Sequence, residues 1–140
     1  MAVKRITRDW LLSAEMDLRS IERVLDDEFL APVACFHAQQ CVEKSLKAIL
    51  EEKGVRPPKT HDILRLYGLV SEATGLELDL RMLQVLNDLY VDARYPGEFG
   101  LLPYGRPSSD DARQFYEFAA EVYQKAWELV AGGLPEESPG

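Results

Sequence analysis

The chain has 140 residues, a length typical of one domain, and 46% of them are hydrophobic, which is enough to form a core. Its formal net charge of −8 argues against a protein that coats duplex DNA or RNA through a generally basic surface, but it is compatible with a local basic pocket. No apolar run approaches the roughly 20 residues that span a bilayer, and we expect neither a targeting segment nor a membrane partner.

The spacing of the apolar residues predicts four or five helices with short connections. We expect them over about residues 7–26, 31–53, 60–74 and 79–94, and from residue 108 or 109 onwards. Gly54 and the pair Pro57-Pro58 should end the second helix, and Thr60 is the expected N-cap of the third. These features predict an all-α fold, an antiparallel up-and-down bundle over residues 1–131, followed by a disordered tail over residues 132–140.

The second predicted helix carries a stripe of polar side chains. At about 100° per residue, one face of the helix holds His37, Gln40, Glu43, Lys44, Lys47 and Glu51. A stripe of mixed charge is most often a solvated face, on which Glu43 and Lys47 would pair at i, i+4. The rest of this helix is rich in small residues, as a central bundle helix would be. A polar stripe on a central helix has to face a cleft, a partner or paired buried groups, so both interpretations stay open.

The two cysteines indicate a reducing environment. Cys35 and Cys41 lie six residues apart in the second helix. They are therefore about 9 Å apart along its axis and cannot form a disulfide with each other. We expect a cytoplasmic location. No pair of cysteines or histidines has the spacing of metal ligands, so neither a metal nor a cofactor is expected.

Four short motifs in this chain resemble the HEPN domain family. The segment 38–48, AQQCVEKSLKA, is similar to the family's QxxEKxLKA helix, and the segment 60–63, THDI, is similar to its THDL start of the third helix. ARYP at 93–96 is similar to the segment that ends its fourth helix, and Asp9-Trp10 with Asp17-Leu18 fits its first. The motifs occur in the family's order from about residue 9 to 127, and the chain looks like a small, stand-alone prokaryotic member.

The resemblance implies a helical bundle that commonly forms a homodimer. It also implies either nucleotide binding or metal-independent RNA cleavage. Many small members are paired with a minimal nucleotidyltransferase as toxin and antitoxin, which makes such a protein an expected partner. The positions that match the family motifs are Gln40, Glu43, Lys44, Lys47, His61, Arg94 and Tyr95. All of them except His61 are expected to bind nucleotide or RNA, and Arg94 and His61 are the candidate catalytic residues.

The chain departs from the ribonuclease members at one position. Those members have a histidine a few residues after the matching arginine, whereas no histidine follows Arg94. An arginine can stabilise charge but cannot transfer protons at neutral pH. The sequence therefore weakens, without excluding, the assignment of RNA cleavage.

Three hypotheses follow for the function of this chain. In the first, Arg94, Lys44 and Lys47 hold the phosphates of a nucleotide or RNA between the second and fourth helices. In the second, His61 or His37 replaces the missing base of a ribonuclease. In the third, the polar stripe and the apolar loop of residues 95–107 form the interface of a structural dimer or adaptor. For His61 and the lysines, ordinary pairing with nearby carboxylates is the simpler expectation.

Overall fold

The computed structural model describes residues 2–92 and 106–131, and for residues 90–92 it describes the backbone alone. The described residues form five α-helices and one short 3-10 helix. The elements are α1 (Arg5–Val24), η1 (Glu28–Leu30), α2 (Ala31–Glu52), α3 (Ile63–Thr74), α4 (Leu80–Asp92) and α5 (Ser109–Val130). The predicted all-α fold is confirmed. The predicted disordered tail and most of the predicted loop 95–107 lie outside the described residues.

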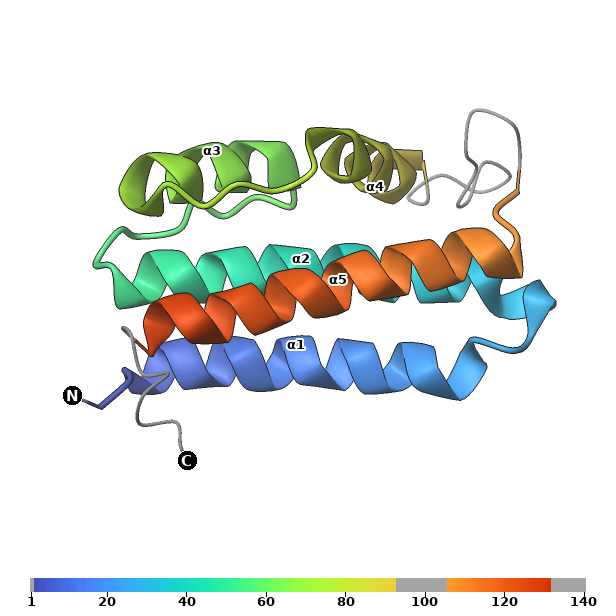
Figure 1. Ribbon diagram of the computed structural model, residues 1–140, viewed down its shortest axis with the longest axis horizontal. Helices are drawn as coiled ribbons and strands as arrows, with labels where there is room; N and C mark the ends of the chain where they lie inside the picture. The colour runs from blue at the N-terminus through green and yellow to red at the C-terminus, as the bar shows by residue number, and fades with distance from the viewer. Residues whose placement is uncertain (1, 93–105, 132–140) are drawn as a thin grey trace.

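The three long helices lie side by side, and the two short ones cover them on one side (Figure 1). α1 runs antiparallel to α2, and α5 runs alongside α2 in the same direction (Figure 1). α3 and α4 lie on the side of α2 and α5 that faces away from α1 (Figure 1). This arrangement is the helical bundle that the sequence predicts. None of the helices in the described ranges is long and apolar enough to cross a membrane.

α2 is the central helix, because it contacts α1, α3, α4 and α5. Its small side chains are almost completely buried, including Ala34, Ala38, Cys41 and Ala48, and they let neighbouring helices approach closely. Its large ones, such as Leu46, Ile49 and Leu50, are fully buried as well. Each of these large side chains contributes roughly 1.5–3 kcal/mol through its removal from water. Because so much of α2 is enclosed, the polar groups on its remaining face need partners within the protein.

The segment between α2 and α3 begins and ends at well-defined caps. Gly54 has a φ of 77°, a left-handed conformation that glycine adopts without strain, as the sequence predicts for the end of α2. The prediction that Thr60 caps α3 is wrong. Asp62 is the N-cap, because its carboxylate accepts hydrogen bonds from the backbone N–H groups of Leu64 and Arg65. Thr60 instead accepts a hydrogen bond from the backbone N–H of Asp62.

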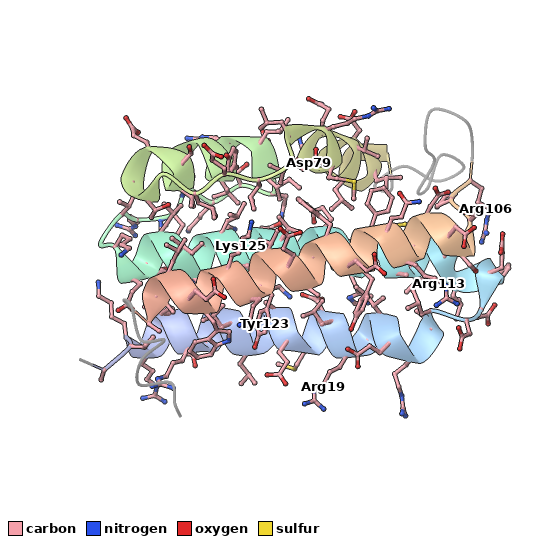
Figure 2. The ribbon with its side chains drawn as sticks, in the orientation of Figure 1. Arg19, Asp79, Arg106, Arg113, Tyr123 and Lys125 are labelled. Carbon is pink, nitrogen blue, oxygen red and sulfur yellow. The ribbon has the colours of Figure 1, made fainter. Side chains whose placement is uncertain are left out.

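Polar side chains cap the start of α5 and connect this helix to α1. The start of α5 is a capping box of Ser108 and Asp111, which exchange hydrogen bonds through side chain and backbone. Further along α5, Tyr116 donates a 2.5 Å hydrogen bond to Glu22 of α1, which raises the pKa of Tyr116 to about 12. Tyr123 lies between the same two helices (Figure 2). α1 and α5 therefore contact each other as well as α2.

Candidate functional site

The first part of the polar stripe of α2 is bound to α1. Asp17 is almost fully buried, with 7% of its side chain exposed. One of its carboxylate oxygens lies 2.8 Å from Nδ1 of His37, and the other accepts a 2.9 Å hydrogen bond from Nζ of Lys44. Lys44 therefore lies against α1, and not in the predicted cleft between α2 and α4. Its charge is already balanced by a buried carboxylate.

Glu43 is the centre of a second buried cluster. Only 4% of its side chain is exposed, and Nζ of Lys47 donates a 3.0 Å hydrogen bond to it, as the i, i+4 spacing predicts. Nδ1 of His61 lies 2.9 Å from Glu43 Oε1 and 3.2 Å from Oε2. Such a contact orients the imidazole ring, 56% of whose side chain remains exposed. A buried carboxylate thus holds a buried lysine and an outward-facing histidine together.

The two glutamines of α2 complete this cluster. Gln39, which is fully buried, donates a 2.9 Å hydrogen bond from Nε2 to the backbone carbonyl of His61. Gln40 donates a 2.8 Å hydrogen bond to Oε1 of Gln39 and a longer one, of 3.5 Å, to Glu43. These bonds fasten the end of the α2–α3 segment to the middle of α2. The position of His61 is therefore set by α2 rather than by the start of α3.

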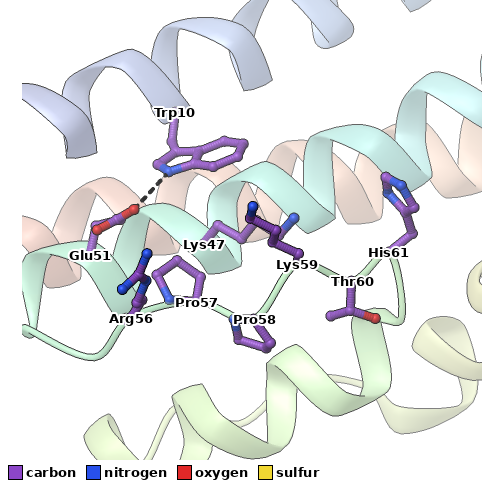
Figure 3. A pocket seen from close by; sticks show the side chains of 9 residues that line it. All are labelled: Trp10, Lys47, Glu51, Arg56, Pro57, Pro58, Lys59, Thr60 and His61. Atoms are coloured by element: carbon purple, nitrogen blue, oxygen red, sulfur yellow. Dashed lines mark hydrogen bonds between the residues drawn. The ribbon is translucent and has the colours of Figure 1, made fainter.

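The α2–α3 segment encloses a pocket against α1 and α2. Past Gly54 it extends back along α2 as far as His61, and two consecutive prolines restrict its backbone. The pocket has a volume of about 430 Å³, within the range of small-molecule sites. It is lined by Trp10 of α1, by Lys47 and Glu51 of α2, and by the segment residues Arg56, Pro57, Pro58, Lys59, Thr60 and His61 (Figure 3).

Positive charge exceeds negative charge in this pocket. Its lining includes the cations Lys47, Arg56 and Lys59, and among the described residues Glu51 is the one carboxylate that lines it. Lys47 is balanced by Glu43, but Arg56 and Lys59 form no ion pair with any other residue in the described ranges. A protein with a net charge of −8 therefore has a local basic site, which attracts anions in spite of the overall charge.

The indole ring of Trp10 forms an aromatic part of the pocket lining. The ammonium of Lys47 lies 5.3 Å from the centroid of the Trp10 ring, within the range of a cation–π contact. The indole N–H of Trp10 donates a 3.3 Å hydrogen bond to Oε2 of Glu51 (Figure 3). The site therefore combines a flat apolar surface, a carboxylate and two cations that have no ion pair among residues 2–92 and 106–131. Anionic ligands with an aromatic or sugar part match these features.

The structure brings together most of the residues predicted for the site. Gln40, Glu43, Lys47 and His61 belong to the Glu43 cluster, while Lys44 lies in the Asp17 cluster beside it. Arg94 and Tyr95, predicted to bind nucleotide or RNA, lie outside the described residues, so their roles stay predictions.

Sequence reasoning missed four contributions to the pocket, namely those of Trp10, Glu51, Arg56 and Lys59. In the sequence, Trp10 stands out only as part of the Asp9-Trp10 motif of the first helix, and Glu51 only as the last member of the polar stripe. Arg56 and Lys59 flank the two prolines in a short basic segment, Arg56-Pro57-Pro58-Lys59. This segment is the one local signal of a basic site in the sequence, since its two prolines restrict the backbone that carries both cations.

The cysteines and the acidic residues offer no second site of this kind. Cys35 and Cys41 are free and buried, and burial raises the pKa of each thiol to about 12, so both are protonated at neutral pH. Within residues 2–92 and 106–131, no group of three His, Cys, Asp or Glu side chains is placed to hold a metal ion.

Comparison with known proteins places the chain in a family. The model of the HEPN domain matches residues 7–129, which is most of the chain. The chain belongs to the HEPN family. No curated protein matches the sequence of this HEPN domain. The resemblance inferred from the four motifs is thus confirmed, and the family match includes both buried clusters and the pocket.

Two solved structures are similar to this HEPN domain. TT1696 from Thermus thermophilus is 25% identical, with a TM-score of 0.71, and the match covers 90% of this chain and 99% of that one. ST0689, described as an archaeal HEPN homologue, is 24% identical, with a TM-score of 0.65 and coverage of 91% and 98%. At 24% identity, the similarity to ST0689 supports the fold alone.

Proposed function

We propose that this HEPN domain is a binding module for a nucleotide or for RNA, and that it holds the phosphate groups in the pocket of the α2–α3 segment. The observation that carries the proposal is the presence of Arg56 and Lys59, two cations without an ion pair in the described part of the chain, beside the Trp10 ring. Arginine offers a planar fork of donors that matches phosphate, and lysine adds a point charge. An aromatic ring can stack on a base.

Ligand-induced stabilisation of the purified protein tests this proposal. A ligand that binds only the folded state at a hundred times its Kd stabilises it by about 2.7 kcal/mol, which raises Tm by several degrees. We expect such a shift with members of a nucleotide and short-RNA panel, and its loss in Arg56→Glu and Lys59→Glu. Arg81→Glu is the matched control, because Arg81 is an exposed cation outside the pocket. An unchanged Tm with every ligand would contradict the proposal.

The resemblance of the sequence motifs to those of small HEPN proteins also supports a proposal about partners. The HEPN domain would form a homodimer in the cytoplasm and pair with a minimal nucleotidyltransferase in a toxin–antitoxin-like system. Co-expression with such a protein, followed by affinity purification and light scattering, measures both associations. A monomer that leaves the nucleotidyltransferase in the unbound fraction contradicts this pairing.

A second candidate function is RNA cleavage, which the geometry of His61 favours. An imidazole held by a buried carboxylate and exposed on a phosphate-binding pocket has the arrangement of an acid–base catalyst. Pure protein should then cleave RNA in the presence of a chelator, and His61→Gln should lose this activity. The variant Arg94→Ala tests the matching position of the ribonuclease members in the same assay. RNA that stays intact through a long incubation argues against this activity.

A further inference from the structure

Glu51 is a carboxylate in a basic pocket, and it forms no ion pair with any residue that the structure describes. It stands four residues after Lys47, a spacing at which the two could pair, yet Lys47 is bonded to Glu43 instead. Arg56 and Lys59 line the same pocket and do not form an ion pair with it either. The carboxylate makes one hydrogen bond, the 3.3 Å contact of Oε2 with Trp10, and Oε1 has no partner in the described part of the chain.

We propose that Glu51 accepts hydrogen bonds from the nucleoside part of a bound nucleotide, so that the pocket selects nucleoside phosphates over inorganic polyphosphates. This inference rests on the proposed function, since it concerns the ligand of the same pocket. It makes Glu51 the residue that determines specificity, while Arg56 and Lys59 supply the attraction for phosphate.

The phosphate and nucleoside parts of a nucleotide differ in chemistry, and this difference supports separate roles for Glu51 and for the two cations. A phosphate near neutral pH presents mostly acceptor oxygens and negative charge, so Glu51 repels it. A nucleoside is neutral and carries hydrogen-bond donors, the ribose hydroxyls and the amino groups of bases. Carboxylates that bind ribose hydroxyls are a known solution in dinucleotide-binding folds. Because Oε2 accepts the hydrogen bond from the indole N–H at the edge of the Trp10 ring, a nucleoside stacked on that ring would bring its donors close to this carboxylate.

Glu51→Gln distinguishes this role from that of a carboxylate that does not contact the ligand. The first predicts weaker binding of ATP in the variant, and the second predicts tighter binding. Removing a charge about 6 Å from a phosphate in water should strengthen binding of inorganic tripolyphosphate about threefold in either case. In this variant the amide oxygen accepts from Trp10 and the NH2 group faces the donors of the ligand, so binding of ATP should weaken about tenfold. A bystander carboxylate predicts tighter binding of both ligands, which would overturn the inference. Isothermal titration calorimetry measures both affinities on the full chain.

Two further variants control for charge and for stability. Glu51→Asp keeps the charge but withdraws the carboxylate, so it should weaken ATP binding and leave tripolyphosphate binding unchanged. Glu128→Gln removes an exposed carboxylate of α5 outside the pocket and should change neither affinity. The Tm of each variant shows whether it is folded. ATP binding that survives in a folded Glu51→Asp overturns the inference.

A set of ATP analogues identifies the donor. Weaker binding of the 2′-deoxy or 3′-deoxy form assigns Glu51 to the ribose, and weaker binding of the analogue without the base amino group assigns it to the base. Equal affinity for all of these ligands and for tripolyphosphate overturns this inference and leaves the proposed function standing. Absence of binding by every nucleotide, RNA and tripolyphosphate overturns the proposed function and this inference together.

Discussion

The buried cluster of Glu43, Lys47 and His61 allows a quantitative prediction about stability. In Glu43→Leu, Lys47 loses the anion that lies 3.0 Å from its ammonium, although only 9% of its side chain is exposed. Breaking a buried ion pair by removing one partner costs about 3–5 kcal/mol, because the remaining charge stays buried without compensation. The cation–π contact of Lys47 with Trp10 is retained, so we expect a value near the lower end of that range, about 3 kcal/mol.

Removing the lysine of the same ion pair should reduce the free energy of unfolding by less. In Lys47→Met the apolar stem is replaced by a side chain of similar volume, and Glu43 keeps the contact with His61 at 2.9 Å. We expect a loss of about 1.5–2 kcal/mol, at the lower end of the range for one hydrogen bond to a charged group. The double variant should be less destabilised than the sum of the two single variants, since neither charge is then left alone.

Urea denaturation followed by far-UV circular dichroism measures all three free energies of unfolding. Arg19→Met serves as the matched control, because it breaks the i, i+4 pair with Glu15 on the surface of α1 and should cost well under about 1 kcal/mol. If Glu43→Leu costs no more than this control, the reasoning that the buried cluster depends on its carboxylate is refuted.

Three further predictions concern the caps, a tyrosine and the thiols. Asp62→Ala should destabilise the protein by about 1 kcal/mol in urea denaturation, and Thr60→Ala by less, because Asp62 is the N-cap of α3. Tyr116 has a folded pKa of about 12, above its ordinary value of 10.0, so its contribution to stability is complete below pH 10 and is lost as the pH rises towards 12. The destabilisation in Tyr116→Phe should therefore shrink over that interval, and a constant difference contradicts the pairing with Glu22. Both cysteines should resist a thiol reagent at pH 8 in the folded protein and react once urea unfolds it; labelling of the native state contradicts their burial.

The helices could be predicted from the sequence because their signals are local. Apolar periodicity defined each element, and Gly54 and Ser108 marked boundaries that the structure confirms. The pair of Glu43 and Lys47 follows from the i, i+4 spacing within one helix. α1 nevertheless begins at Arg5, before the predicted start at residue 7, on the N-cap Lys4, which makes no side-chain cap hydrogen bond. Fraying and weak caps make such boundaries hard to fix in advance.

The pocket could not be predicted, because it depends on contacts between elements. The sequence does not state that the α2–α3 segment returns along α2, and this course is what brings Arg56 and Lys59 opposite Trp10. Nor does it state that α1 lies beside the polar stripe and supplies Asp17 to Lys44. In both cases the missing information is which neighbour packs on which side of a central helix.

The contacts of the lysines on α2 determine which cations can bind the phosphate of a ligand. Lys44 and Lys47 were expected to bind phosphate, but each is neutralised by a carboxylate that is itself almost fully buried. Releasing either lysine towards a ligand would break its hydrogen bond to a buried carboxylate and leave that carboxylate with a histidine as its remaining close partner, at a cost of about 1.5–2 kcal/mol. Arg56 and Lys59 carry no such cost, because neither has an ion pair to break among residues 2–92 and 106–131. The attraction for phosphate should therefore come from the segment between α2 and α3, while α2 itself provides the rigid support and the orientation of His61.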